Sequence, residues 1–183
     1  LRDLREASPK CKIILIDKWE KKGPVFDILR AADSINDEDQ VLVSYCDYFM
    51  DWDYKKFKSD LDRLKPDGAI PCYTGFHPHL IHKKNLYATC QVNKSNYLKL
   101  ILEKNQFNED KMKDYHSPGA YYFKSGKILK KYCKQMIEAK DTLNNEYYAS
   151  LPFNYMVKDG LKVWCPPNVN YFCQWGTPED LSE

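Results

Sequence analysis

The stretch VLVSYCDYFMDWD, residues 41–53, joins a run of apolar and small residues to three carboxylates, Asp47, Asp51 and Asp53. Continuous apolar character over so few residues predicts a strand buried on both faces, as in a parallel sheet covered by helices. Asp47 then follows the strand at the carboxyl edge of the sheet, where open α/β sheets bind ligands. We therefore expect Asp47 to hold a divalent metal and, through it, phosphate oxygens.

Segments of extended and helical character alternate on either side of this stretch. Their apolar spacing predicts strands at residues 12–17, 40–46 and 69–73, with helices at 24–32 and 53–64 between them. This β-α-β-α-β order favours parallel strands joined by right-handed crossovers. The predicted fold class is a three-layer, Rossmann-like α/β fold with a mixed, mostly parallel sheet and helices on both faces.

The second half of the chain contains shorter predicted elements. Strands are expected at 87–92, 97–103, 120–123, 161–165 and 170–173, and helices at 125–139 and 145–158. Pro152 limits how regular the last helix can be. Because 183 residues supply one core of ordinary size, we expect a single domain over residues 1–183.

The charged and apolar residues of the chain bear on whether it binds nucleic acid or a membrane. The 28 basic and 26 acidic side chains leave a formal net charge of +2, which gives no reason to expect nucleic acid or an anionic membrane. No apolar run approaches the roughly 20 residues that span a bilayer, and the N-terminus lacks a signal-peptide pattern. The sequence therefore predicts a soluble, cytoplasmic protein.

Seven cysteines are scattered along the chain. An odd number without a Cys-x-x-Cys pair predicts neither a zinc site nor a disulfide framework. Several, such as Cys46 and Cys72, lie within apolar runs. We expect most of them to be buried, reduced thiols.

Asp51 and Asp53 have two interpretations. Either could add a carboxylate to a metal site around Asp47. Either could instead cap the helix that follows, because aspartate is favoured at the N-cap. For Asp53 the cap is the preferred interpretation, whereas Asp51 is kept as a candidate second metal ligand.

Several segments, in this order along the chain, resemble those of the sugar-nucleotide pyrophosphorylases. They are Gly23-Pro24-Val25, YCDYFMDWDYKKF (45–57), TGFHPH (74–79), LEK (102–104), SPGAYYF (117–123), NNEYYASL (144–151) and QWGTPEDL (174–181). The sequence is most similar to the bacterial capsule and lipopolysaccharide type, whose fold is of the GT-A kind. The resemblance extends from residue 11 to the end. It implies an enzyme that joins a nucleoside triphosphate to a sugar 1-phosphate, releasing pyrophosphate, for surface polysaccharide biosynthesis.

The resemblance also implies roles for individual residues. Asp47 corresponds to the strand-end aspartate that binds Mg²⁺, and Lys104 to the lysine that contacts the sugar phosphate, so these two are the expected catalytic residues. Gly23, Tyr45 and Cys46 are expected at the nucleotide, and Gly75, Glu103, Gly119 and Glu146 at the sugar substrate. Mg²⁺ is the expected cofactor, and a nucleoside triphosphate and a sugar phosphate are the expected partners. The protein would mainly align these groups and neutralise their charge, without a covalent nucleophile.

Two departures from the family pattern alter the expectation. Gln174 occupies the position where most members carry a second metal-binding aspartate, and a neutral amide is a weaker ligand for Mg²⁺ than a carboxylate. The N-terminal strand and glycine-rich loop that cradle the triphosphate are also expected upstream of residue 1. We therefore expect this chain alone to be inactive, with an exposed sheet edge that favours association into homo-oligomers.

Two alternatives belong to other functional classes. A metal-dependent GT-A glycosyltransferase would use Asp51-Trp52-Asp53 as an Asp-x-Asp pair that binds metal and the diphosphate of a nucleotide sugar. A non-catalytic domain would bind a nucleotide sugar without turnover, and Gln174 adds weight to this interpretation. The first predicts cleavage of a nucleotide sugar, and the second predicts binding without release of pyrophosphate.

Overall fold

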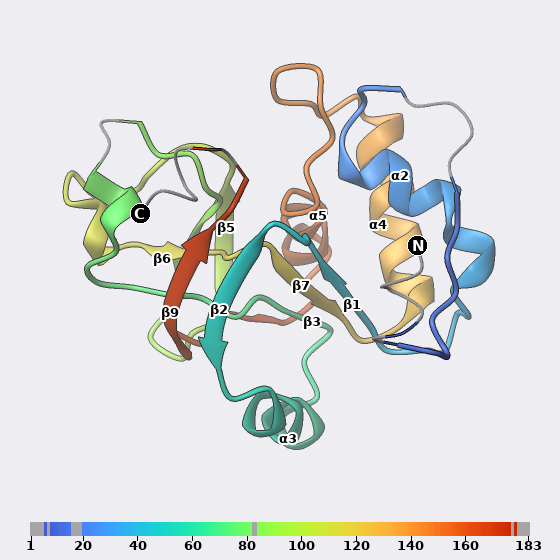
Figure 1. The fold of residues 1–183 in the computed structure, drawn as a ribbon, viewed down its shortest axis with the longest axis horizontal. Helices are drawn as coiled ribbons and strands as arrows, with labels where there is room; N and C mark the ends of the chain where they lie inside the picture. Colours follow the sequence, from blue (N-terminus) through green and yellow to red (C-terminus); the bar gives the residue numbers. More distant parts are fainter. Residues whose placement is uncertain (1–5, 7, 16–19, 82–83, 177, 179–183) are drawn as a thin grey trace.

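The computed structural model describes residues 6, 8–15, 20–81, 84–176 and 178, and contains helices and strands in one mixed α/β fold (Figure 1). The helices are α2 (Pro24–Arg30), α3 (Tyr54–Leu64), α4 (Gly126–Glu138) and α5 (Pro152–Lys158), with 3-10 turns η1 (Ala32–Ser34), η2 (Pro78–Ile81) and η3 (Lys111–Lys113). The strands are β1 (Val41–Ser44), β2 (Tyr48–Trp52), β3 (Gly68–Ala69), β4 (Thr89–Val92), β5 (Leu98–Leu102), β6 (Tyr115–His116), β7 (Ala120–Phe123), β8 (Val163–Trp164) and β9 (Val169–Gln174).

The central sheet has the strand order β1-β7-β3-β8. Strand β7 pairs antiparallel with both β1 and β3, and only β3 and β8 pair in parallel among the described strands of this sheet. The α/β class is confirmed, but the predicted mostly parallel sheet is not. Because β1 and β3 both run opposite to β7, they do point the same way, as the β-α-β order predicts. They are not neighbours, because a strand from the second half of the chain lies between them.

Strand β1 is also less buried than predicted. It lies at the edge of the sheet, and its residues alternate between half-buried and exposed, with Leu42 37% exposed. The apolar run therefore marks a half-covered edge strand rather than a strand buried on both faces. Cys46, on the connection that follows β1, is exposed as well.

Two smaller sheets accompany the central one. Strands β2 and β9 form an antiparallel ribbon, in which Phe49 pairs with Cys173 and Asp51 with Tyr171. The sequence did not predict β2, because its pairing partner lies more than a hundred residues away. The third sheet has the order β5-β4-β6, and the predicted pairing of strands near 87–92 and 97–103 is confirmed as the antiparallel pair β4 and β5.

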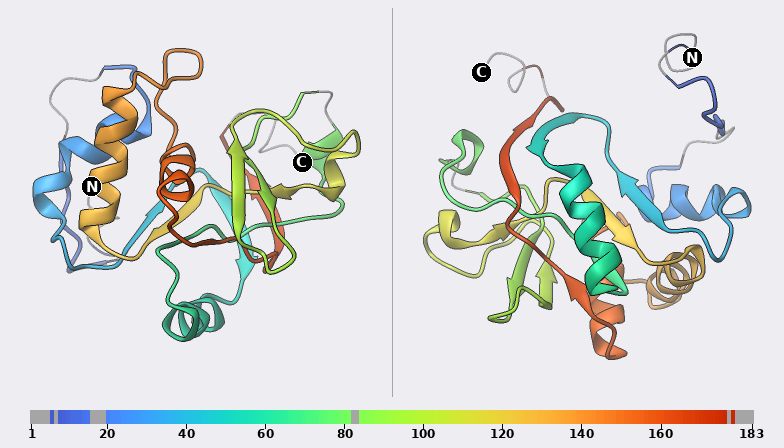
Figure 2. Two further views of the ribbon diagram at one scale, coloured as in Figure 1. Left: turned by 180° about the vertical axis from the view of Figure 1, so that it is seen from behind. Right: turned by 90° about the horizontal axis from the view of Figure 1, so that it is seen from below.

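Helices pack against both faces of the central sheet (Figures 1 and 2). Side chains along β7 alternate between the faces, as they must in a strand. Tyr121 and Phe123 contribute to a core that also contains residues of α2, α4 and α5. Tyr122 faces the other way and packs with Phe57 and Leu61 of α3.

The helix starts follow local signals in the sequence. Pro24 is the first residue of α2, and Ser125 caps α4 by accepting a hydrogen bond from the Ile128 N–H. Pro152 likewise opens α5, so the predicted helix at 145–158 forms only in its second half. The predicted strand at 12–17 does not form over residues 12–15, and residues 16 and 17 lie outside the described part of the chain. Within the described residues, no helix has the length and apolar character needed to cross a bilayer.

Candidate functional site

A cavity of about 650 Å³ opens where the connection between β1 and β2 meets the start of α2 and the ends of several loops. Its walls come from stretches 20–27, 44–48, 86–88, 103–104, 117–121, 146–148 and 172–174. The volume is in the range of sites that hold small-molecule ligands and cofactors. Of the residues predicted for the site, the cavity brings together Gly23, Tyr45, Cys46, Asp47, Glu103, Lys104, Gly119 and Glu146.

Asp47 lies on the connection between β1 and β2, beside the end of β9. Its carbonyl oxygen accepts a hydrogen bond from the Trp175 N–H at 2.7 Å, which fixes this connection to the end of β9. A Cβ atom at Gly176 would lie 3.1 Å from Asp47 Oδ2 and 2.8 Å from Gln174 Nε2. The carboxylate and the amide therefore converge over a glycine that leaves room between them.

Lys104 and Glu146 are joined through the hydroxyl of Tyr148. Lys104 Nζ donates to Tyr148 Oη at 2.8 Å, and this hydroxyl donates to Glu146 Oε2 at 2.9 Å. Lys104 Nζ also lies 4.9 Å from the centre of the Tyr148 ring. The hydrogen bond to Tyr148 raises the pKa of Lys104 above its usual value, so the ammonium group is charged at neutral pH. The three side chains form one polar wall of the cavity.

Glu103 is a largely buried carboxyl group next to this wall. Burial raises its pKa to about 7, while the Ser150 hydroxyl, which donates to Oε2 at 2.5 Å, and the charge of Lys104 act in the opposite direction. Near neutral pH, therefore, both protonation states of Glu103 are populated. It can donate a hydrogen bond when protonated and accept one when ionised.

Two of the predicted glycines are required by the packing of the chain itself. Gly23 has φ 89°, and a Cβ there would lie 2.7 Å from the Tyr147 backbone nitrogen. Gly119 has φ 95°, and a Cβ there would lie 2.6 Å from the Tyr45 ring. Both positions exclude a side chain for steric and conformational reasons. The Gly23 contact brings the start of α2 against the segment that carries Glu146 and Tyr148.

Two predicted residues lie elsewhere. Gly75 has φ 83° in a loop where its N–H donates to the Met112 carbonyl oxygen, away from the cavity walls. Asp51 lies on β2, four residues after Asp47, and is not part of the cavity wall. Asp53 caps α3, because its Oδ1 accepts from the Lys56 N–H at 2.9 Å, which confirms the preferred interpretation.

The sequence did not predict two of the contacts that build the site. Ser150 has no spacing signal that connects it to Glu103, and the contact exists because the loop before α5 folds back onto the end of β5. Tyr148 belongs to a pair of tyrosines next to Glu146, and the sequence makes such a pair a site candidate without predicting its contacts. Its bridging position between Lys104 and Glu146 depends on the fold rather than on local spacing.

Comparisons with known proteins give a fold but no family. No family model matches the sequence, and no curated protein matches it. The fold resembles that of the nucleoside-diphosphate-sugar pyrophosphorylase from Vibrio cholerae RC9, with a TM-score of 0.67 and 14% identity over 90% of this chain. It also resembles a Bacillus anthracis protein assigned as a glucose-1-phosphate thymidylyltransferase, in complex with a sucrose, with a TM-score of 0.64 and 14% identity over 90% of this chain. The chain spans 65% and 60% of the lengths of these two proteins.

Proposed function

We propose that this protein is a nucleotidyltransferase that joins a nucleoside triphosphate to a sugar 1-phosphate and releases pyrophosphate. The observation that carries the proposal is the meeting of Asp47 and Lys104 in one cavity large enough for a nucleotide and a sugar. The fold shared with a sugar-nucleotide pyrophosphorylase and with a protein assigned as a thymidylyltransferase supports it. A role in capsule or other surface polysaccharide synthesis follows from the sequence resemblance.

Lys104 is the proposed anchor for the attacking phosphate. Its ammonium group donates to a neutral hydroxyl, that of Tyr148, so its charge can act on an incoming phosphate. Glu146 and Glu103 would then accept hydrogen bonds from sugar hydroxyls on the same wall. A phosphate monoester already carries a nucleophilic oxygen, so positioning and charge neutralisation suffice.

Asp47 is the proposed ligand for Mg²⁺. Asp47 Oδ2 lies beside Gly176, where the missing Cβ leaves a space, whereas Gln174 presents its amide nitrogen, Nε2, to the same glycine. The single carboxylate fits an ion that takes one protein carboxylate and completes its octahedral shell with phosphate oxygens and water. The ion would supply positive charge at the reacting phosphates. Tyr45 and Cys46, from the same connection, would contact the nucleotide, together with Gly23.

A glycosyltransferase site built on Asp51-Trp52-Asp53 has less support. One carboxylate of that pair is engaged in capping α3, and the pair lies outside the cavity. An Asp-x-Asp motif needs both carboxylates close to the diphosphate of its substrate. The nucleotidyltransferase therefore accounts better for the polar groups that line the cavity.

The proposal is tested by incubating the whole gene product that contains these residues with Mg²⁺, each common nucleoside triphosphate and a panel of sugar 1-phosphates. We expect pyrophosphate and a nucleotide sugar in equal amounts for one triphosphate and sugar phosphate. Release of a nucleoside diphosphate from a nucleotide sugar, without pyrophosphate, would contradict the proposal in favour of a glycosyltransferase. Binding of a nucleotide sugar by a folded protein that forms no product would contradict it in favour of a binding domain.

A further inference from the structure

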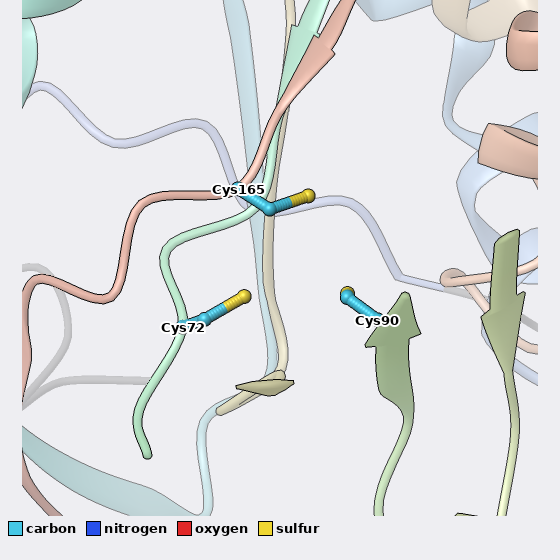
Figure 3. Close-up of side chains that lie close together, drawn as sticks. All are labelled: Cys72, Cys90 and Cys165. Atoms are coloured by element: carbon cyan, nitrogen blue, oxygen red, sulfur yellow. The ribbon is translucent and has the colours of Figure 1, made fainter. Parts of the chain in front are cut away.

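Three cysteine side chains meet in the protein core, outside the walls of the functional cavity. The sulfur atoms of Cys72, Cys90 and Cys165 all lie within 4.8 Å of one another (Figure 3). The three residues are 0%, 3% and 0% exposed. Spacings of 18 and 75 residues along the chain gave no sign of this cluster, which the fold alone assembles.

The backbone holds each cysteine in place independently. The Cys72 N–H donates to the Pro166 carbonyl oxygen at 2.8 Å, and the Cys165 N–H donates to that of Asn96 at 2.7 Å. Cys90 lies in β4, where it pairs with strands on both sides. In Figure 3 the three side chains come from separate segments and their sulfur atoms point toward a common space. Such a set of donors is arranged before any ligand arrives.

The sulfur separations suit a shared central atom better than a disulfide. Three sulfurs at about 2.3 Å from one atom are about 4 Å apart in a planar complex and about 3.5 Å apart in the pyramid formed by an element with a lone pair, so sulfurs that lie within 4.8 Å of one another need to approach by no more than about 1.3 Å. A disulfide needs two sulfurs at about 2.05 Å and leaves the third thiol unused.

The number of ligands and the net charge of the complex indicate which kind of central atom this cluster would bind. Within the described residues, the cluster contains three ligand-bearing side chains and no fourth histidine, cysteine or carboxylate. Zinc bound to three thiolates would need a water as its fourth ligand and would leave a net negative charge in an apolar core. An element in the +3 state that binds only three thiolates gives a neutral complex without a vacant position.

We propose that Cys72, Cys90 and Cys165 form a binding site for a trivalent, three-coordinate thiophilic element of the arsenic(III) type. Arsenous acid would react with the three thiols to give one As(SR)₃ unit and three water molecules. Three As–O and three S–H bonds break while three As–S and three O–H bonds form, and no atom changes its oxidation state.

The reaction carries no net charge into the core. Each thiol proton leaves with a hydroxide of arsenous acid as water. Arsenous acid is itself uncharged at neutral pH, so it can enter an apolar core without the desolvation cost that opposes Zn²⁺.

The test uses arsenous acid on the reduced protein, with Cys11, Cys46 and Cys173 replaced by serine in every sample to remove the more accessible thiols. We expect native mass spectrometry to show one arsenic bound per chain with the loss of three thiol hydrogens. X-ray absorption should show three sulfur neighbours and no oxygen. Zn²⁺ should bind at least tenfold more weakly.

Cysteine variants provide the matched comparison. Cys90→Ala should abolish the three-sulfur signal, whereas Cys133→Ala should keep it, because Cys133 is an equally buried cysteine of α4 outside the cluster. Arsenic with an oxygen neighbour, the same three-sulfur signal in Cys90→Ala, or no binding to the protein that retains the cluster would each overturn the proposal. The first and third of these outcomes are measured on the protein with all three cluster cysteines, so they do not depend on how any cluster variant folds.

Discussion

Replacing Glu103 by glutamine should change how the stability of the protein depends on pH. Glutamine keeps the shape of the side chain and an oxygen that can accept the hydrogen bond from the Ser150 hydroxyl. It removes the ionisation of the carboxyl group. Any part of the pH dependence that arises from Glu103 should therefore disappear.

The magnitude follows from the shift of the pKa. Burial raises the pKa of Glu103 from 4.5 to about 7, so the folded state binds the proton more tightly than the unfolded state. The resulting stabilisation is fully present below pH 4.5 and is lost as the pH rises through about 7. A rise of about 2.5 units is worth about 3 kcal/mol, of which about 2.5 kcal/mol is lost between about pH 5 and pH 8.

The assay is urea denaturation of the wild-type protein and Glu103→Gln across this pH range. We expect the free energy of unfolding of the wild type, relative to the variant, to fall by about 2.5 kcal/mol from pH 5 to pH 8. Other titrating groups cancel in the difference. Glu138→Gln is the control, at an exposed position near the end of α4, and its free energy of unfolding should change with pH in parallel with that of the wild type. Parallel curves for Glu103→Gln as well would refute the reasoning about its burial.

Three further substitutions test other parts of the structure. Asp53→Ala should destabilise the protein by about 1 kcal/mol in urea denaturation, because α3 loses its N-cap, and an unchanged midpoint would contradict the cap. Gly119→Ala should lower the free energy of unfolding clearly more than Gly160→Ala, because both glycines have positive φ but only at Gly119 would the added Cβ lie 2.6 Å from a ring. Equal losses of stability would exclude this contact. Tyr148→Phe should raise the KM for the sugar phosphate about tenfold, because it removes the hydroxyl that orients Lys104, and an unchanged KM would contradict that role.

The parts of the fold that the sequence predicted correctly depend on local signals. Helix α4 has a serine cap and apolar residues at helical spacing, and both lie within a single short segment. The hairpin of β4 and β5 is also local, because its strands are separated by only a few polar residues. Such features are encoded in neighbouring residues and need no knowledge of the rest of the chain.

The errors concern pairings between distant segments. Strand β7 inserts antiparallel between β1 and β3, and β2 pairs with β9 from the end of the chain. Nothing in the local pattern of residues 41–52 distinguishes an edge strand followed by a ribbon from a single buried strand. Partner choice is decided by packing across the whole domain, which short-range periodicity does not report.

The candidate site likewise has parts that the sequence predicted and parts that only the structure shows. Asp47 was predicted from its position after an apolar run, and Lys104 and Glu146 from a resemblance to motifs; the structure brings all three to one cavity. The link through Tyr148 and the burial of Glu103 required the three-dimensional structure, because they depend on contacts between separate loops. The cysteine cluster was missed entirely for the same reason.

The most direct test of the proposed function compares two matched pairs of variants in the pyrophosphate-release assay. Asp47→Asn and Lys104→Met change groups of the cavity wall, whereas Asp51→Asn and Lys99→Met change the same residue types on nearby strands outside it. We predict that each cavity variant lowers kcat/KM by about a hundredfold or more, while each outer variant stays within about threefold of the wild type. Equal activity of Asp47→Asn and Asp51→Asn, or of Lys104→Met and Lys99→Met, would contradict the assignment of this cavity as the site of nucleotidyl transfer.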